Sequence, residues 1–237
     1  MDGSMLRSMN ILAIIPARGG SKRFPGKNVV HFNGVPLVGL TAEIASKSGV
    51  FQSVCVSSDS EEILTVAQQY GANYVHHRSD MLAGDTVQLS DVCINILNDA
   101  ASQGQTFDAF AILTPMNPLR SVEDIQSAKE LLVETGADGV ISLARHTHSP
   151  QRALAIRHNR IEQYFPSEEL ETYKTEEPLY YHDAAIVLMR TAPFLDTGKL
   201  YGSNVVPYFT PSSRSVNIDY PIDLEWAKFL FSQTHPQ

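Results

Sequence analysis

The most informative stretch of the chain is NILAIIPARGGSKRFPGKN, residues 10–28, in which an apolar run leads directly into a glycine pair flanked by basic residues. Residues 10–17 are almost uninterruptedly hydrophobic, which is typical of a strand buried on both faces of a parallel sheet. The two glycines that follow permit a sharp turn and bring backbone N–H groups close to an anion. The stretch therefore predicts a central strand that leads into an anion-binding loop.

Outward from this stretch, short apolar segments alternate with segments of helical spacing. The predicted strands are 53–58, 72–76, 107–113, 139–143, 184–189 and 204–209, and the predicted helices are 37–47, 60–70, 86–101, 122–135 and 222–232. This alternation implies βαβ units, and hence an α/β fold with an open, mostly parallel twisted sheet and helices on both faces. Because ligands of such sheets bind beyond the carboxyl ends of the strands, we expect the site in the loops after Ala17, Ser58, Thr114 and Leu143.

Composition limits the class of protein. With 237 residues, 43% of them hydrophobic, the chain can bury one core, and we expect a single domain over residues 10–235, with residues 1–9 a tag or disordered. The net charge of −8 argues against a nucleic-acid partner, and no apolar run is long enough to span a membrane. Cys55 and Cys93 lie in apolar surroundings, which indicates buried thiols and a cytoplasmic protein, with a disulfide as the alternative.

Residues 145–183 interrupt the alternation of strands and helices. The segment Arg157–Arg160 resembles a hairpin turn, and the acidic, aromatic stretch after it has no clean period. Long irregular segments inside a compact domain are usually functional or serve as interaction arms. We therefore expect an insert within the domain at this place.

The glycine-rich loop brings together four cations within ten residues: Arg18, Lys22, Arg23 and Lys27. In an otherwise acidic protein, these side chains would neutralise a triphosphate that the loop backbone cradles. The spacing excludes a P-loop, because five residues separate Gly20 from Gly26 and Asn28 stands where that motif has Ser or Thr. The dinucleotide fingerprint G-x-G-x-x-G is also absent, and a surface turn with solvated charges is the alternative interpretation.

Residues 15–28 resemble the signature loop of the acylneuraminate cytidylyltransferases, the CMP-sialic acid synthetase family. Further matches in the same order extend the resemblance over residues 11–231; they are residues 56–59, 78–86 and 113–120, and residues 216–219 with Asp223. The resemblance implies a nucleotidyltransferase-like fold and Mg²⁺-dependent transfer of CMP from CTP to the anomeric hydroxyl of an acidic nonulosonate of the sialic, legionaminic or pseudaminic acid type. It also implies a homodimer in which the insert is the dimerisation arm.

The resemblance assigns roles to particular positions. The residues implied for the CTP phosphates and ribose are Ala17, Arg18, Gly19, Gly20, Ser21, Lys22, Lys27 and Asn28. Arg78 and the loop 83–87, including Thr86, would recognise the cytosine, although Arg78 could form a surface ion pair and residues 84–86 could cap a helix. The residues implied for the sugar are Thr114, Asn117, Arg152 and Lys174. Thr114 and Asn117 could instead form a polar turn, and Lys174 would reach the neighbouring subunit's site.

The expected catalytic residues are Arg18 and Lys22, which would stabilise phosphate charge, and Asp219, which would bind Mg²⁺. The family commonly has two acids two residues apart, whereas this chain has Asn217 and Asp219. An amide oxygen can bind Mg²⁺ but carries no charge. A catalytically silent nucleotide-binding paralogue is therefore an alternative. Asp223 is interpreted as a first-turn carboxylate of the last helix.

Two observations bear on the sugar. The segment Pro25–Lys27 is similar in cytidylyltransferases for the eight-carbon sugar Kdo, which makes a Kdo enzyme a further alternative. Against it, residues 113–120 lack the Asp that Kdo enzymes carry there. The string Tyr-His-Asp-Ala at 181–184 is similar to that of some pseudaminate enzymes and favours a 5,7-diamino nonulosonate.

Overall fold

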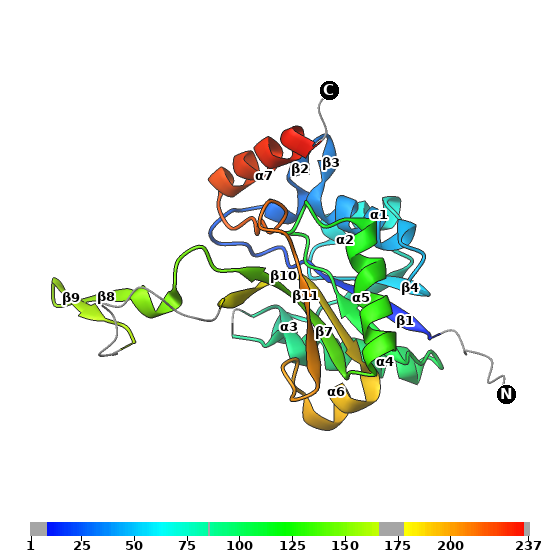
Figure 1. Cartoon of the computed structure of the whole chain (residues 1–237). Coiled ribbons are helices and arrows are strands. Elements are labelled where there is room, and N and C mark those ends of the chain that lie inside the picture. The colour runs from blue at the N-terminus through cyan, green and yellow to red at the C-terminus, as the bar shows by residue number, and fades with distance from the viewer. Residues whose placement is uncertain (1–8, 85, 166–177, 235–237) are drawn as a thin grey trace.

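A single seven-stranded sheet forms the centre of the computed structural model, which describes residues 9–84, 86–165 and 178–234 (Figure 1). The strands follow the order β11-β7-β10-β6-β1-β4-β5. Their bounds are β1 (Ile11–Pro16), β4 (Ser53–Ser58), β5 (Tyr74–His77), β6 (Ala109–Ile112), β7 (Gly139–Arg145), β10 (Tyr180–Arg190) and β11 (Val205–Phe209). All of them run parallel except β10, which is antiparallel to both neighbours, so the predicted mostly parallel sheet is confirmed.

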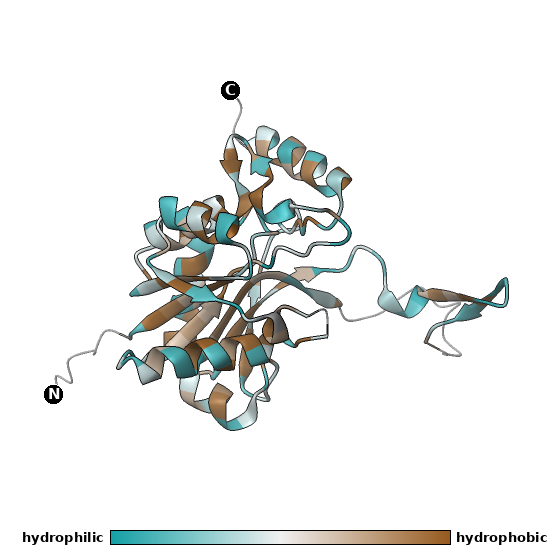
Figure 2. Cartoon of the chain, turned by 180° about the vertical axis from the view of Figure 1, so that it is seen from behind, coloured by the Kyte–Doolittle hydropathy of each residue, from teal (hydrophilic) through white to brown (hydrophobic). Residues whose placement is uncertain are grey.

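Helices cover both faces of this sheet, as predicted. Their bounds are α1 (Leu37–Lys47), α2 (Glu61–Gln69), α3 (Asp80–Ala83), α4 (Leu89–Ser102), α5 (Val122–Thr135), α6 (Thr191–Thr197) and α7 (Pro221–Thr234), with 3₁₀ turns η1 (Lys27–Val29) and η2 (Pro150–Arg152). Helices α1, α2 and α5 pack on one face, and α4 and α6 on the other. Helix α7 packs its inward residues, including Leu224 and Ala227, on a third cluster with Phe32 and Leu37. Figure 2 shows hydrophobic strands at the centre and hydrophilic outer helix surfaces.

Local sequence explains where these elements begin and end. Helix α5 starts with a capping box, in which Ser121 and Asp124 each accept the other's backbone N–H, and it ends at Gly136, whose φ is 63°. Helix α4 begins later than predicted, because Gln88 is extended and serves as its N-cap. Thr86 is therefore not the N-cap of α4, Gly84 is the C-cap of α3, and Asp85 lies outside the described residues.

Several short elements were not predicted, among them α3, η1 and η2. Helix α6 follows β10 directly, and β2 (His31–Phe32) and β3 (Val35–Pro36) form a small hairpin. The hairpin turn is Asn33-Gly34, with φ values of 49° and 86°. An Asn-Gly pair is a strong hairpin signal, so this element was readable from the sequence.

The insert is shorter than the predicted 145–183. Arg145 ends β7 and pairs with Tyr180 of β10, so residues 180–183 belong to the central sheet. The predicted turn at 157–160 is confirmed: it joins β8 (Leu154–Arg157) and β9 (Arg160–Gln163), with φ values of 50° at His158 and 59° at Asn159. This hairpin projects away from the body of the molecule (Figure 1).

The sheet order places the functional loops. The chain passes from β1 through β4 to β5 at one edge and then returns to β6 on the other side of β1. The order of the strands therefore reverses between β1 and β6, and ligands of open α/β sheets bind beyond the carboxyl ends of the strands at such a point. The loops that follow β1, β4 and β6 meet there.

The structure tests the predictions that the two cysteines are buried thiols and that the chain has no membrane-spanning segment. Cys55 and Cys93 are both buried and free, so the predicted core thiols are confirmed and the disulfide alternative is wrong. Burial raises the pKa of the Cys93 thiol to about 12. Within the described ranges, the helices all fall short of the length and apolarity that a membrane crossing requires.

Candidate active site

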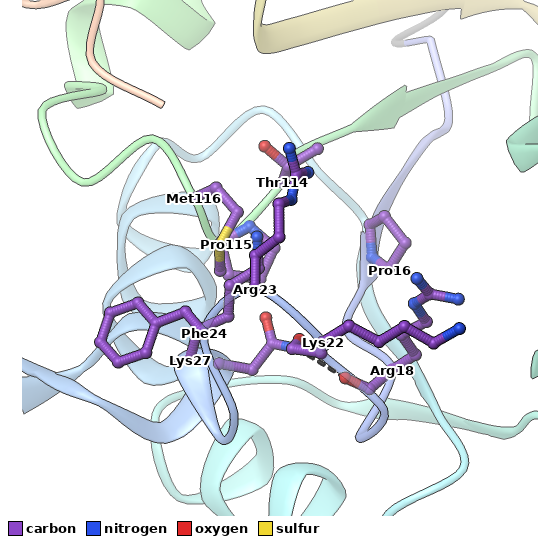
Figure 3. Close-up of a pocket in the computed structure, with 11 residues that line it drawn as sticks. Pro16, Arg18, Lys22, Arg23, Phe24, Lys27, Thr114, Pro115 and Met116 are labelled. Atoms are coloured by element: carbon purple, nitrogen blue, oxygen red, sulfur yellow. Dashed lines mark hydrogen bonds between the residues drawn. The ribbon is translucent and has the colours of Figure 1, made fainter. Parts of the chain in front are cut away.

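A cavity of about 390 Å³ opens at the carboxyl ends of β1 and β6 (Figure 3). It is lined by Pro16, Arg18, Ser21, Lys22, Arg23, Phe24, Lys27, Asn28, Thr114, Pro115 and Met116. All four cations of the glycine-rich loop are therefore on its wall. This concentration of positive charge in an acidic chain suits a polyanionic ligand.

Hydrogen bonds hold the glycine-rich loop in shape. The backbone N–H of Gly19 donates to Asp59 Oδ1 at 2.7 Å, and Asn28 Nδ2 donates to the carbonyl of Arg18 at 2.8 Å, the dashed line in Figure 3. A Cβ added at Gly19 would lie 3.3 Å from the Cβ of Ser60, so the loop approaches the start of α2 closely. Gly20 has nothing within 4 Å of its own added Cβ. A side chain at Gly19 would therefore crowd Ser60, whereas a side chain at Gly20 would meet open space.

Two of the loop cations contact the carboxylate expected to bind metal. Asp219 Oδ1 accepts from Arg23 Nη2 at 2.8 Å and from Lys27 Nζ at 3.1 Å. The Lys27 side chain is only 16% exposed, and its Nζ also donates to the carbonyl of Ile218. Arg23 is more open, with its guanidinium 5.7 Å from the centre of the Tyr220 ring. Asp219 therefore lies beside the glycine-rich loop, which is called the phosphate loop below after its proposed ligand.

The neighbours of Asp219 decide what kind of metal site the chain can form. Asn217 is exposed and Asp219 is partly exposed, whereas the alternate residues Val216 and Ile218 are buried. Asp223 Oδ2 accepts the backbone N–H groups of Asp219 (2.9 Å) and Tyr220 (2.8 Å), which confirms its place in the first turn of α7. Across the described residues, no three His, Cys, Asp or Glu side chains gather as a metal cluster. One carboxylate and one amide oxygen fit a Mg²⁺ ion that is held largely by a triphosphate.

Arg78 reaches the same end of the sheet from the loop after β5. Its Nε donates to Ser57 Oγ and its Nη2 to the carbonyl of Ser57, both at 3.2 Å. Burial lowers the pKa of the guanidinium, the Asp59 carboxylate opposes this shift, and the charge of Arg18 adds to it. Arg78 thus lies within electrostatic reach of the glycine-rich loop. Its guanidinium is hydrogen-bonded to Ser57 inside the protein, which is not the surface ion pair of the alternative interpretation.

Thr114, Asn117 and Arg120 hold an irregular part of β10 in place. The register between β10 and β7 shifts between His182 and Val187, and Ala184 has a φ of 61°. Thr114 Oγ1 contacts Asn117 Oδ1 (2.6 Å) and the carbonyl of Ala184 (2.9 Å). Asn117 Nδ2 donates to the carbonyl of residue 183 at 2.8 Å, and Arg120 Nε donates to that of residue 185 at 2.7 Å.

A second cavity, of about 360 Å³, lies where the start of α4 meets the loop after α6. It is lined by Gln88, Leu89, Ser90, Gly198, Lys199, Leu200 and Tyr201. The Tyr201 hydroxyl lies 2.6 Å from His182 Nδ1, next to the irregular part of β10. Burial lowers the pKa of His182 and raises that of Tyr201.

Comparison with known proteins identifies the family. A family model described as Cytidylyltransferase matches residues 12–230, which is most of the chain. The chain belongs to the cytidylyltransferase family. It is 35% identical to CMP-N,N'-diacetyllegionaminic acid synthase of Legionella pneumophila over 92% of this chain and 94% of that one. It is 31% identical to pseudaminic acid cytidylyltransferase of Campylobacter jejuni over 96% of this chain and 98% of that one.

Solved structures agree with the fold of this family. A CMP:2-keto-3-deoxy-manno-octonic acid synthetase complexed with CTP aligns with a TM-score of 0.67 at 14% identity, covering 95% of this chain and 99% of that one. A 4-diphosphocytidyl-2C-methyl-D-erythritol synthase aligns with a TM-score of 0.68 at 12% identity, covering 94% and 98%. At such identities the likeness concerns the fold alone.

The cytidylyltransferase structure brings most of the predicted site together. Of the loop residues, Arg18, Ser21, Lys22, Lys27 and Asn28 line the first cavity, Ala17 is buried behind it, and Gly19 and Gly20 form its turn. Thr114 also lines this cavity. Asn117 is buried, and its amide is used by backbone carbonyls, which favours the polar-turn interpretation over direct contact with a ligand.

Two predicted residues do not line the first cavity, and a third cannot be placed relative to it. Arg152 ends η2, shortly before β8, and is not among the residues that line the first cavity. Thr86 is exposed in the segment before α4. Lys174 lies outside the described residues.

Sequence reasoning missed residues that shape this cytidylyltransferase site. Asp59 was part of a matched segment, but its bond to Gly19 was not foreseen. Ser57 Oγ is hydrogen-bonded to His76 Nδ1 and also accepts from Arg78. The buried Arg120 donates to the carbonyl of residue 185 in β10. A polar residue inside an apolar strand, such as Ser57, is the signal that could have pointed to them.

Proposed function

We propose that this chain transfers CMP from CTP to the anomeric hydroxyl of an acidic nonulosonate sugar. The sugar oxygen attacks the α-phosphorus, the bond from that phosphorus to the oxygen bridging to the β-phosphate breaks, and pyrophosphate leaves while the hydroxyl proton passes to solvent. The cationic cavity at the strand-order reversal is the observation that carries the proposal. The two relatives named above are enzymes for legionaminic and pseudaminic acid, which supports a nine-carbon acidic sugar.

The loop residues perform the electrostatic part of the reaction. Catalysis of nucleotidyl transfer rests mainly on alignment and on stabilising charge at the phosphate oxygens. Arg18 and Lys22 neutralise the phosphates from the cavity wall. The N–H of Gly20 is the backbone donor assigned to them, because the N–H of Gly19 donates to Asp59 and that of Ser21 to the carbonyl of Gly19. Lys27 and Asn28 hold the loop in place, because Lys27 donates to Ile218 and Asp219 and Asn28 donates to the carbonyl of Arg18. Asp219 and Asn217 would hold Mg²⁺, which would supply positive charge to the phosphates and acidify the attacking hydroxyl.

We assign the base end to Arg78, with Thr86 in the adjacent segment, because Arg78 lies beside Asp59 and Arg18 at the loop. The sugar end includes Thr114 on the cavity wall. We assign the second cavity to the sugar as well, since Lys199 there supplies a cation of the kind that a sugar carboxylate needs. His182, next to Tyr201, is consistent with the pseudaminate-like string noted in the sequence.

We also propose a homodimer in which residues 146–179 form the arm of a single-domain protein. Ile156 and Ile161 pair across the β8–β9 hairpin, and their side chains are 78% and 72% exposed. An isolated two-stranded hairpin is at best marginally stable in water, so a partner surface would cover these residues. In such a dimer, Arg152 would reach the partner's sugar site, and the resemblance assigns the same role to Lys174. Sedimentation as a monomer at micromolar concentration would count against the dimer.

Location in the cytoplasm is proposed on the free, buried thiols of Cys55 and Cys93, which suit a reducing compartment. No nucleic acid or membrane partner is proposed for this acidic chain.

Two alternatives make different predictions for the same assay. A Kdo enzyme would turn over the eight-carbon sugar, and a silent paralogue would bind CTP without releasing pyrophosphate. The experiment is pyrophosphate release with CTP and Mg²⁺ against N-acetylneuraminate, legionaminate, pseudaminate and Kdo. Release with one nonulosonate, confirmed by the mass of its CMP conjugate, is the expected result. Release with Kdo alone, or with none of the four, would overturn the proposal.

A further inference from the structure

A buried chain of hydrogen bonds lies behind Arg78. Arg78 Nε donates to Ser57 Oγ at 3.2 Å, Ser57 Oγ lies 2.9 Å from His76 Nδ1, and His76 Nε2 lies 2.8 Å from Asn95 Oδ1. Ser57 is completely buried, and His76 is only 6% exposed. Four side chains from β4, β5, the loop after β5 and α4 are therefore linked in series.

The protons in this chain can be placed from its arginine end. A guanidinium only donates, so the Ser57 oxygen accepts from Arg78 and its hydroxyl hydrogen must point elsewhere. The remaining partner is His76 Nδ1, which then accepts and leaves the hydrogen of the neutral imidazole on Nε2. That hydrogen is donated to Asn95 Oδ1. The order Arg78, Ser57, His76, Asn95 satisfies every donor and acceptor along the chain.

The chain fixes one edge of the guanidinium. Nε and Nη2 of Arg78 are both held by Ser57, through its hydroxyl and its carbonyl, and the backbone N–H of Arg78 donates to the carbonyl of Ser58 at 2.8 Å. Asp59, the next residue of the same segment, holds Gly19 of the phosphate loop. The residues that orient Arg78 are thus continuous with those that shape the phosphate loop.

We propose that Ser57, His76 and Asn95 are positioning residues that hold Arg78 ready for the nucleoside end of CTP. The inference rests on the proposed function, because it takes CTP as the ligand. An arginine side chain has about 2 kcal/mol of rotamer entropy to lose when it is immobilised. A guanidinium that is already held in place loses less on binding, so the chain raises affinity for CTP without touching the reacting phosphorus.

The first test removes the central hydroxyl. Ser57→Ala disconnects Arg78 from His76 with almost no change of volume. We expect the Kd and KM for CTP to rise about tenfold, which corresponds to roughly 1.4 kcal/mol, while kcat changes by less than about threefold. Ser48→Ala is the matched control, since Ser48 is a buried, hydrogen-bonded serine at the end of α1, outside the proposed site. It should leave both constants unchanged.

A pair of substitutions at His76 separates positioning from packing. His76→Leu removes the acceptor for the Ser57 hydroxyl, whereas His76→Asn keeps an acceptor close to the Nδ1 position. We expect the leucine variant to weaken CTP binding as Ser57→Ala does and the asparagine variant to recover part of the loss. Equal effects of the two variants would indicate a merely structural residue.

A double-mutant cycle gives the decisive result. Isothermal titration calorimetry with CTP and, separately, with pyrophosphate compares wild type, Ser57→Ala, Arg78→Ala and the double variant. If the chain acts through Arg78, Ser57→Ala weakens CTP binding, leaves pyrophosphate binding unchanged, and adds nothing in the Arg78→Ala background. Unchanged CTP affinity in Ser57→Ala, or full additivity in the double variant, would overturn the inference.

These binding measurements need no sugar, so the inference and the proposed function can fail separately. A protein that binds CTP but releases no pyrophosphate with any sugar would overturn the proposed function alone, and the cycle would still decide the role of Ser57. A wild-type protein that does not bind CTP would overturn both.

Discussion

Lys27 Nζ lies 3.1 Å from Asp219 Oδ1 and donates as well to the carbonyl of Ile218. The two side chains are 192 positions apart in the sequence, yet they meet where the loop after β1 approaches the segment before α7. Because the ammonium is largely shielded, this contact joins the phosphate loop and the acidic residue into one structural unit.

Asp219→Ala should lower kcat by about 100-fold or more while CTP affinity stays within about threefold of wild type. In the proposed mechanism this carboxylate holds Mg²⁺, and its removal would leave Arg23 and Lys27 more available to the phosphates, so we expect ground-state binding to be kept. Steady-state kinetics and calorimetry check the two halves of the prediction. Glu225→Ala removes a carboxylate from the outer side of α7 and should change neither quantity. Near-normal turnover of Asp219→Ala would remove this residue from the mechanism.

Asn217→Asp should lower the Mg²⁺ concentration needed for half-maximal activity by about three- to tenfold. The substitution adds a second carboxylate two residues from Asp219. Activity as a function of Mg²⁺ concentration measures the shift, with Asn204→Asp, at an exposed position before β11, as a control for added charge. An unchanged Mg²⁺ requirement would mean that position 217 does not face the metal.

The two loop glycines should respond differently to alanine. Gly19→Ala places a methyl group 3.3 Å from Ser60 Cβ, which should cost about 1 kcal/mol of stability and lower the melting temperature of the free protein by a few degrees. Gly20→Ala meets nothing within 4 Å, so the free protein should keep its melting temperature while CTP binding weakens. Thermal melts without ligand and CTP titrations test both. Equal melting temperatures for the two variants would contradict the packing role of Gly19.

Asp124 should make stability depend on pH in the acid range. Burial alone would raise the pKa of this carboxyl, but hydrogen bonds from Arg214 and Tyr208 outweigh it and hold the pKa below its usual value. A depressed folded-state pKa stabilises the protein above the unfolded value of about 3.9, and the contribution is lost as pH falls through the folded value. Asp124→Asn should therefore cost about 2–3 kcal/mol near pH 7.

The difference between Asp124→Asn and wild type should shrink as the pH falls below about 4. Urea unfolding at several pH values measures it. Asp196→Asn, which removes an exposed carboxylate on α6, controls for the change in net charge. A gap that stays constant down to pH 2 would show that ionisation of Asp124 is not its source.

Much of the fold was predictable because its signals are local. The apolar run of β1, the alternation of strands and helices, and the turn at His158 and Asn159 depend on neighbours within a few residues. The four cations of the phosphate loop are an equally local signal, since they lie within ten consecutive residues. The start of α4 and the pairing of residues 180–183 with β7 were predicted less well, because competing tertiary contacts decide where an element ends.

The sequence by itself determined the class of fold, the family resemblance and the charge of the phosphate loop, because composition, periodicity and spacing are properties of adjacent residues. Only the tertiary structure decided that Asn117 braces β10 from within the core, that Asp219 meets Lys27, and that His76 supports Arg78 through Ser57. These contacts join segments that are far apart along the chain. Their geometry follows from sheet order and register, which no local pattern encodes.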